Sequence, residues 1–243
     1  MDYAVEVTNL TRVFGSFTAV DSVNFRVPKG EIFGFLGANG AGKTTTIRML
    51  CGLLEPSSGS GKVAGLDIMR EYERIKFQIG YMSQKFSLYD DLTVQENIEF
   101  YGGIYGLSSS VLRERLAILG AELELTPHRK KLCGSLPLGW KQKIALAAAL
   151  VHDPQIVFLD EPTSGVDPAA RRQFWLVIYR LAEQGKTIFV TTHFMDEAEY
   201  CHRASIMKLG KVIEIDRPER LKEKYGVSSM QEVFLRAVSG SAS

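Results

Sequence analysis

The sequence is poor in cysteine and carries almost no excess charge, and both shortages exclude classes of protein. Its three cysteines, Cys51, Cys133 and Cys201, lie far apart and form neither a disulfide framework nor a paired metal-ligand motif, which suits a reducing compartment. Lys and Arg total 29 against 28 Asp and Glu. This balance gives no electrostatic reason to expect nucleic acid or a membrane surface as the main partner.

Long apolar runs are also missing. The longest, residues 144–151, is much shorter than the roughly 20 residues that cross a bilayer. Residues 1–6 lack the basic start and apolar core of a signal peptide. The sequence therefore predicts a soluble, cytosolic chain.

The 243 residues suit one large domain, and their apolar segments alternate between strand and helix character. Alternation of this kind predicts a mainly parallel sheet with helices on its faces. Strands are expected at 3–7, 17–19, 23–27, 32–36, 156–159, 187–191, 204–207 and 212–215. Helices are expected at 43–52, 112–119, 139–151, 168–184, 195–201 and from 218 onward, and residues 56–61 as a loop. The predicted parts are a core (1–90 and 152–215), an inserted helical lobe (about 91–151) and a helical tail (about 216–243).

Residues 37–44 read Gly-Ala-Asn-Gly-Ala-Gly-Lys-Thr, the pattern G-x-x-x-x-G-K-[ST] of a phosphate-binding loop. A strand-like run, 32–36, precedes it and a helix-compatible run, 45–50, follows, which is the context that this loop requires. The glycines let backbone N–H groups turn toward phosphate oxygens, and the following helix directs its positive end at the same anion. Lys43 supplies a mobile positive charge, and the Thr44 hydroxyl can ligate Mg²⁺.

Residues 156–162 form a second motif, an apolar strand that ends in Asp-Glu-Pro. The strand would deliver Asp160 to its C-terminal edge, where a carboxylate can hold Mg²⁺ directly or through water. Glu161 beside it would polarise an attacking water. Such a strand end is common by itself, but this one follows a phosphate loop and precedes the run Thr-Ser-Gly-Val-Asp at 163–167.

Taken in order along the chain, the motifs resemble those of the nucleotide-binding subunit of an ATP-binding cassette (ABC) transporter. The resemblance covers essentially the whole sequence. Phe14 stands where that family has an aromatic residue that stacks on adenine, and residues 81–84, Tyr-Met-Ser-Gln, match its glutamine loop. Residues 164–167 match its D-loop, and Thr191-Thr192-His193 match its switch histidine.

The resemblance implies an α/β P-loop NTPase core with an N-terminal antiparallel β part and an inserted helical lobe. It also implies ATP and Mg²⁺ as cofactors. The implied catalytic residues are Glu161, His193 and Gln84. The implied nucleotide-binding residues are Phe14, Gly37, Ala38, Asn39, Gly40, Ala41, Gly42, Lys43, Thr44 and Thr45. The implied Mg²⁺ ligands are Thr44, Gln84 and Asp160, and the implied D-loop residues are Ser164, Gly165, Val166 and Asp167.

The sequence departs from the family at the signature motif, usually Leu-Ser-Gly-Gly-Gln. The aligned residues are Leu136, Pro137, Leu138, Gly139 and Trp140. In the family, the serine hydroxyl and the second glycine N–H bind the γ-phosphate of ATP held by the opposite subunit. Pro137 has neither a hydroxyl nor an N–H, whereas Gly139 and the following helix N-terminus remain. Two interpretations stay open: a working variant carried by Gly139 and the helix dipole, or a degenerate half-site in an asymmetric dimer.

The tail, Lys-Leu-Gly-Lys-Val-Ile at 208–213 followed by Pro-Glu-Arg-Leu at 218–221 and Met-Gln-Glu-Val-Phe-Leu at 230–235, resembles the end of ABC-2-type exporter ATPases. The favoured function is an ATPase subunit, peripheral on the inner face of the membrane, that drives a separate transmembrane permease. Its second partner is another ABC ATPase domain, in a homodimer or heterodimer, and nucleic acid is not expected. The alternative is a soluble ABC ATPase without a permease.

Two His-containing pairs could suggest metal ligands, but no second pair stands at ligand spacing. These pairs are Cys201-His202 and His152-Asp153. They are interpreted as surface or packing residues near helix ends. The one basic run, 129–131, is interpreted as a solvated face.

Overall fold

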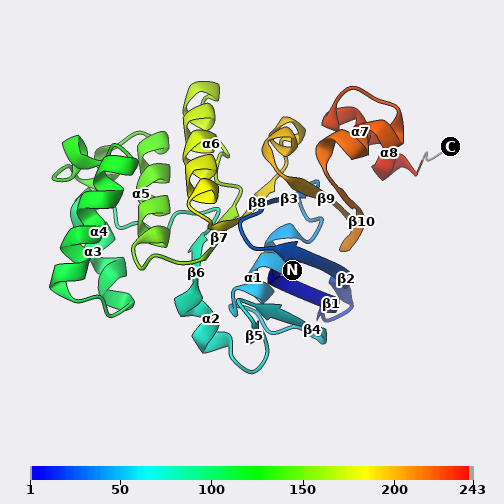
Figure 1. The fold of residues 1–243 in the computed structure, drawn as a ribbon, viewed down its shortest axis with the longest axis horizontal. Helices are drawn as coiled ribbons and strands as arrows, with labels where there is room; N and C mark the ends of the chain where they lie inside the picture. Colours follow the sequence, from blue (N-terminus) through cyan, green and yellow to red (C-terminus); the bar gives the residue numbers. More distant parts are fainter. Residues whose placement is uncertain (1, 241–243) are drawn as a thin grey trace.

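The computed structural model describes residues 2–240, which form two sheets and several groups of helices (Figure 1). Residues 1 and 241–243, which belong to the predicted domain and its tail, lie outside the described residues. The predicted α/β class, with a mainly parallel sheet and an antiparallel β part, is confirmed.

The N-terminal part forms a four-stranded antiparallel sheet with the order β2-β1-β4-β5. Its strands are β1 (Tyr3–Phe14), β2 (Phe17–Pro28), β4 (Ser58–Val63) and β5 (Leu66–Asp67). The three short strands expected before residue 28 are two strands of 12 residues each. Register shifts along the β1–β2 pair interrupt the apolar alternation without ending the pairing, which is why the sequence pattern looks broken.

The prediction of a loop at 56–61 is wrong from Ser58 onward, because this Ser/Gly-rich segment is strand β4. It pairs with β1, with Gly61 opposite Val7 and Ser60 opposite Thr8. The backbone of β1 approaches so closely that a Cβ at Gly59 would lie 2.2 Å from the Asn9 carbonyl oxygen. Pairing with a neighbouring strand therefore overrides the low strand propensity of the segment.

The main sheet has six strands in the order β10-β9-β3-β8-β7-β6. Its strands are β3 (Ile32–Leu36), β6 (Ile79–Met82), β7 (Ile156–Asp160), β8 (Thr187–Thr192), β9 (Arg203–Lys208) and β10 (Lys211–Asp216). All neighbours are parallel except β9 and β10. The carboxyl ends of β3, β8, β7 and β6 consequently meet at one edge.

The helices gather in separate groups around the sheets. They are α1 (Lys43–Leu50), α2 (Tyr72–Gln78), α3 (Val94–Ile104), α4 (Ser109–Glu122), α5 (Leu138–Leu150), α6 (Pro168–Glu183), α7 (Pro218–Tyr225) and α8 (Met230–Ser239). Three short 3₁₀ helices are η1 (Thr126–His128), η2 (Cys133–Ser135) and η3 (Met195–Tyr200). In Figure 1, α3, α4 and α5 form a lobe at one end of the molecule and α7 and α8 lie at the other. The helix expected at 195–201 is the 3₁₀ helix η3.

The core between the two sheets contains a cluster of phenylalanine side chains among its aliphatic residues. Phe25 of β2, Phe33 and Phe35 of β3, and Phe189 of β8 are buried with ring centroids 5.2–6.1 Å apart. Helix α1 belongs to the same core through buried side chains such as Ile47. This packing fixes the phosphate loop, which joins β3 to α1, at the edge of the main sheet.

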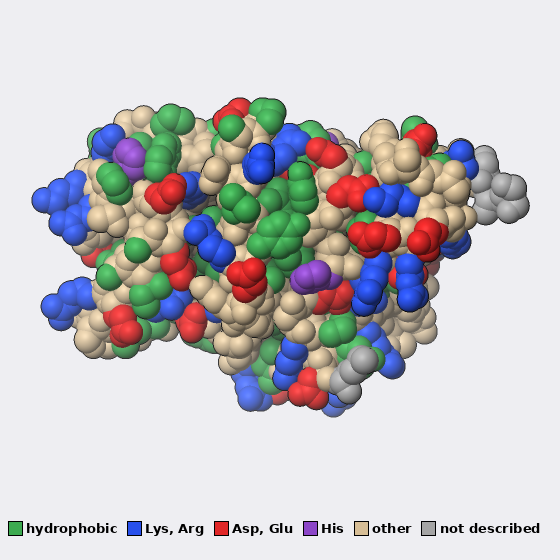
Figure 2. Space-filling model, turned by 45° about the horizontal axis from the view of Figure 1, so that its top comes forward, with side chains coloured by type: hydrophobic (Ala, Val, Ile, Leu, Met, Phe, Trp, Pro, Cys, Tyr) green, Lys and Arg blue, Asp and Glu red, His purple; other side chains and the backbone are tan. Residues whose placement is uncertain are grey.

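The surface agrees with the even charge balance of the sequence. Figure 2 shows acidic and basic side chains interspersed over the face it presents. None of the described helices combines the length and the apolar character needed to cross a membrane.

Candidate nucleotide-binding site

The predicted motifs come from four neighbouring strands and meet at one sheet edge. The phosphate loop follows β3, and Asp160 ends β7. His193 follows β8, which lies between these two strands, and Gln84 comes shortly after β6 on the other side of β7. Since all four strands are parallel, their carboxyl ends deliver these groups to the same place.

Glycine is required at two positions of the phosphate loop because other backbone comes too close. A Cβ at Gly37 would lie 2.7 Å from the Met207 carbonyl oxygen, and one at Gly42, whose φ is 107°, would lie 2.6 Å from the Ala19 carbonyl oxygen. Within residues 2–240, the loop N–H groups of Asn39, Gly40 and Gly42 have no hydrogen-bond acceptor. The loop is therefore a cradle of free donors at the start of α1, as a phosphate group requires.

Lys43 is the buried cation of this cradle, with only 4% of its surface exposed. Its Nζ donates to the carbonyl oxygens of Gly37 (2.8 Å) and Ala38 (3.2 Å), and lies 3.5 Å from Glu161 Oε1. Burial lowers the pKa of Lys43, and the nearby Glu161 carboxylate opposes that shift. The two loop carbonyl oxygens and the Glu161 carboxylate thus hold the Lys43 ammonium against the phosphate loop.

Asp160 is buried at the end of β7 and accepts two hydroxyl hydrogen bonds on one oxygen. The donors to Oδ1 are Thr44 Oγ1, at 3.0 Å, and Thr191 Oγ1, at 2.6 Å. Burial raises the pKa of Asp160, and these two hydrogen bonds oppose the increase. A carboxylate oxygen beside a threonine hydroxyl is the hard-oxygen donor set that Mg²⁺ prefers, so Thr44 and Asp160 fit the predicted ion.

Glu161 has an unusual backbone conformation, with φ at 49° in the left-handed region. A residue with a Cβ adopts this conformation at a cost on the order of 1 kcal/mol, so its surroundings must stabilise it. Its carboxylate contacts three other predicted site residues, Gln84, His193 and Lys43. Oε2 accepts from Gln84 Nε2 at 3.0 Å and lies 3.1 Å from His193 Nδ1, while Oε1 faces Lys43.

Phe14 ends strand β1 and is 43% exposed, apart from this carboxylate cluster. The Arg12 guanidinium lies over its ring, 4.5 Å from the centroid. Arg12 Nη1 also donates to the Glu55 carbonyl oxygen at 2.7 Å, which ties β1 to the segment after α1. Arg12 is not among the site residues predicted from the sequence, although a basic residue two positions before an aromatic residue was a possible signal.

The variant signature segment lies at the start of α5 in the helical lobe. Pro137 is the residue before the helix, and no side chain caps the helix there. The Leu138 side chain is 43% exposed, and its Cδ2 lies 3.2 Å from the position that a Cβ of Gly165 would occupy. Trp140 packs on His128 with ring centroids 4.1 Å apart. Among the described residues, no hydrogen bond or ion pair joins residues 136–140 to the phosphate loop.

The D-loop segment contacts this signature segment within the same chain. A Cβ at Gly139 would lie 3.6 Å from Val166 Cγ1. Asp167 caps α6, since its Oδ1 accepts from the N–H groups of Ala169 and Ala170, both at 3.0 Å. The acidic D-loop residue thus has a structural role in its own chain.

The two His-containing pairs have structural partners. His202 Nδ1 accepts from the Ile32 N–H at 2.9 Å. His152 Nε2 lies 2.9 Å from the Ile79 carbonyl oxygen, and its ring stacks on Tyr105 with centroids 3.5 Å apart.

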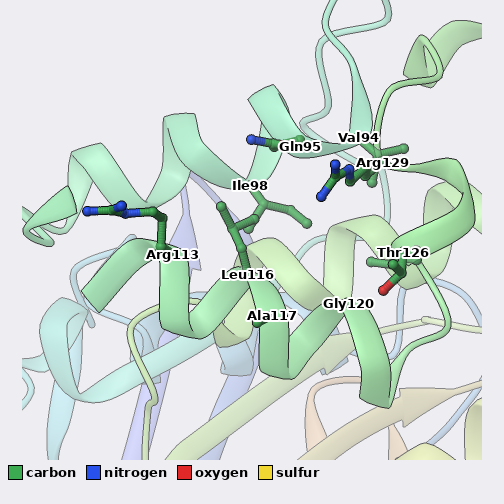
Figure 3. Close-up of a pocket in the computed structure, with 10 residues that line it drawn as sticks. Val94, Gln95, Ile98, Arg113, Leu116, Ala117, Gly120, Thr126 and Arg129 are labelled. Atoms are coloured by element: carbon green, nitrogen blue, oxygen red, sulfur yellow. The ribbon is translucent and has the colours of Figure 1, made fainter. Parts of the chain in front are cut away.

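A cavity of about 500 Å³ lies away from these motifs, between α3 and α4 (Figure 3). Apolar side chains such as Val94, Ile98 and Leu116 line it, with Arg129 among its polar residues. The described residues that line it belong to none of the nucleotide motifs. This cavity is therefore separate from the proposed nucleotide chemistry.

A phosphate loop on a parallel sheet, with two carboxylates on a neighbouring strand end, defines a nucleotide-binding domain of the P-loop class. Comparison with known proteins identifies the family. Residues 20–164 match the family model described as ABC transporter. The chain is 36% identical over 243 residues to the linearmycin resistance ATP-binding protein LnrL of Bacillus subtilis (strain 168), covering 96% of this chain and 78% of that protein. The chain belongs to the ABC transporter family.

A second curated relative is longer than this chain. The chain is 46% identical over 239 residues to the probable multidrug ABC transporter ATP-binding protein YbhF of Escherichia coli (strain K12). The aligned region covers 96% of this chain but 41% of YbhF. The chain thus spans about two fifths of the length of that relative.

Solved structures agree with the family. The ATP binding subunit of an ABC transporter superposes with a TM-score of 0.86 at 27% identity, covering 96% of this chain and 99% of that one. A dimeric post-hydrolysis state of the ATP-binding cassette MJ0796, bound to ADP and Pi, superposes with a TM-score of 0.79 at 26% identity, covering 88% and 98%.

Proposed function

We propose that this chain binds ATP with Mg²⁺ and hydrolyses it as the cassette that drives an export permease. The observation that carries the proposal is the Glu161 carboxylate, held among Lys43, Gln84 and His193 at the edge that bears the phosphate loop. The names of the relatives, which include multidrug and antibiotic-resistance ATP-binding proteins, support a transport function over a soluble ATPase without a permease.

Each group at the edge then has a role in hydrolysis. The free loop N–H groups and Lys43 bind the triphosphate, and Phe14 stacks on adenine. Glu161 accepts a hydrogen bond from the attacking water and polarises it, while His193 and Gln84 position that water and the γ-phosphate. Thr44, Asp160 and Gln84 would hold Mg²⁺, which when bound offsets the charge of the phosphate oxygens.

A second cassette is part of the proposal, because among the described residues no hydrogen bond or ion pair joins the signature segment to the phosphate loop of its own chain. Gly139 and the N-terminus of α5 would complete the site on a partner cassette, and closure of the two would move the permease. As part of this proposal, the chain acts at the cytoplasmic face of a membrane. The alternative is an asymmetric pair of cassettes with one degenerate site. The observation in its favour is Pro137, which precedes α5 and has no N–H to donate.

The test is the Glu161→Gln variant, which keeps the hydrogen-bonding shape and removes the negative charge. ATP turnover should fall by at least about 10²-fold, with ATP binding retained and a closed dimer accumulating. Phosphate release, calorimetry and sedimentation measure these three quantities. Glu183→Gln, an exposed change at the end of α6, is the matched control. Turnover at the parent rate in Glu161→Gln would show that Glu161 is not the catalytic carboxylate.

A further inference from the structure

Thr191 has a hydroxyl group buried between the two carboxylate-bearing residues of the site. Its side chain is 0% exposed, and its register partner across the β7–β8 pair is Asp160. The hydroxyl oxygen lies 2.6 Å from Asp160 Oδ1 and 2.8 Å from the backbone nitrogen of Glu161. A hydroxyl has one proton and free lone pairs, so it donates to the carboxylate and accepts from the N–H at the same time.

The second of these hydrogen bonds explains how Glu161 keeps its left-handed backbone. At φ 49° the chain turns out of the line of β7, and the buried Glu161 N–H needs an acceptor. Thr191 Oγ1 supplies that acceptor from the neighbouring strand. With this backbone conformation, the Glu161 side chain points toward Gln84 and His193. Removal of the hydroxyl would leave the buried Glu161 N–H without this acceptor and would thus weaken the support of the left-handed backbone.

We propose that Thr191 is a positioning residue for hydrolysis, which sets the direction of Glu161 and orients Asp160 through one hydroxyl. This inference rests on the proposed function, since it concerns the residue that would polarise the attacking water. Thr191 acts through Glu161 and Asp160, because its buried hydroxyl is engaged by these two residues. Its removal therefore changes the rate of the chemical step more than it changes the affinity for ATP.

The experiment compares three single variants of the full chain. Thr191→Val removes the hydroxyl and keeps the branched shape, whereas Thr191→Ser keeps the hydroxyl. Thr187→Val is the matched control, because Thr187 lies in the same strand, is 1% exposed, and its hydroxyl accepts from the Gly30 N–H at 2.9 Å. Thr187→Val also removes a hydroxyl that makes a hydrogen bond, but it does so at the end of β8 that is remote from the site.

We expect Thr191→Val to lower kcat by about tenfold or more, with the calorimetric Kd for ATP unchanged within about threefold. Thr191→Ser should return kcat to within about threefold of the parent, and Thr187→Val should keep the parent kcat. Both valine variants should lower the midpoint temperature of thermal unfolding, and Thr191→Val should lower it more, because Thr191 loses two hydrogen bonds and Thr187 loses one.

A double variant tests whether Thr191 acts through Glu161. In the Glu161→Gln background, Thr191→Val should have much less effect on the remaining turnover than in the parent. Full additivity, parent-like kcat in Thr191→Val, or equal losses in Thr187→Val and Thr191→Val would each overturn the inference. None of these outcomes affects the proposed function, which fails only if the parent does not hydrolyse ATP or if Glu161→Gln is as active as the parent.

Discussion

The proposed ATP site has two halves, which are organised in opposite ways. One is the phosphate edge, the edge of the main sheet that bears residues 37–44, Asp160 and Glu161. The other is the signature segment, residues 136–140. At the phosphate edge, Lys43, Asp160 and Glu161 are nearly buried and each is held by hydrogen bonds or an ion pair within the chain. In the signature segment, Leu138 is exposed and no side chain caps the start of α5. The first region is preorganised by its own chain.

This difference indicates how the work of catalysis is divided. A buried polar cluster keeps its geometry before the nucleotide arrives, so the energy of binding is not used to order it. An exposed helix N-terminus has free N–H groups that an anion on another molecule can reach. Substitutions at the phosphate edge should thus act on one molecule, whereas substitutions in the signature segment should act only between molecules.

The largest expected effect is that of Lys43→Ala, at the phosphate edge. The loop N–H groups would then hold a multiply charged triphosphate without the ammonium, and ATP affinity should fall at least about 100-fold. Calorimetry on the monomer at low protein concentration measures this. Lys62→Ala, an exposed change on β4, is the control and should bind like the parent. Undiminished affinity in Lys43→Ala would refute the assignment of the loop.

The next effect concerns Gly139→Val, in the signature segment. A Cβ there would meet Ala170 Cβ at 3.5 Å, an ordinary contact, so the monomer should fold and bind ATP. A branched side chain directed at the partner's phosphate should nevertheless block closure and lower turnover at least about tenfold. Pro137→Ser should change turnover modestly, because Gly139 and the N-terminus of α5 would still carry the contact with the phosphate.

Turnover against protein concentration separates the two interpretations of the signature. A working homodimer predicts second-order dependence in the parent and its loss in Gly139→Val. A degenerate half-site predicts that Gly139→Val is silent in the purified chain and that activity appears only when a second, intact cassette is added.

A smaller effect is expected for His193→Ala, which tests the boundary between binding and chemistry at the phosphate edge. His193 Nδ1 lies 3.1 Å from Glu161 Oε2, and its ring packs against that of Phe194, tilted by 37° with centroids 4.2 Å apart. Turnover should fall by about 3- to 10-fold, with little change in monomer affinity for ATP. If monomer affinity falls by the same factor, His193 belongs to the primary binding site instead.

The smallest effect on turnover is expected at His152, just beyond the end of α5 that is remote from the signature, where the prediction concerns stability. Burial lowers the pKa of His152 from 6.5 to about 4, and Arg115 and Lys186 add to the shift while Asp153 opposes it. Because the unfolded chain binds this proton and the folded chain does not, stability should fall as the pH drops from 6.5 toward 4. The loss attributable to His152 should be about 1–3 kcal/mol.

Urea unfolding of the parent and of His152→Gln at pH 5 and pH 7.5 measures this contribution. Glutamine can still donate to the Ile79 carbonyl oxygen but does not titrate. The difference in stability between the two pH values should therefore be smaller in the variant. Equal differences in the two proteins would contradict the prediction.

The elements with strong local signals were predicted well. The strand at 32–36 and the start of α6 at Pro168 coincide with the structure, and α5 begins one residue before its predicted position. The errors fall where tertiary contacts override local preference. Ser58–Val63 has few strand-forming side chains but completes the pairing of β1, and the segment from Met195 is a 3₁₀ rather than an α-helix. The assignment of roles to individual site residues remains a prediction.

The sequence by itself determined the chemical groups of this protein. The spacing of Gly37, Gly42 and Lys43 specifies a phosphate loop, because the conformation of a tight loop depends on which of its own residues lack a Cβ. An apolar strand that ends in Asp160 and Glu161 can likewise be recognised from a short run of consecutive residues.

Only the tertiary structure decided which of these groups meet. The strand order β3-β8-β7-β6 joins residues more than 100 positions apart, as in the hydrogen bond between Thr44 and Asp160. The register that sets Thr191 opposite Asp160 lets one hydroxyl form hydrogen bonds with both carboxylate-bearing residues. Strand order and register depend on pairing between distant segments, and no local pattern of residues encodes that pairing.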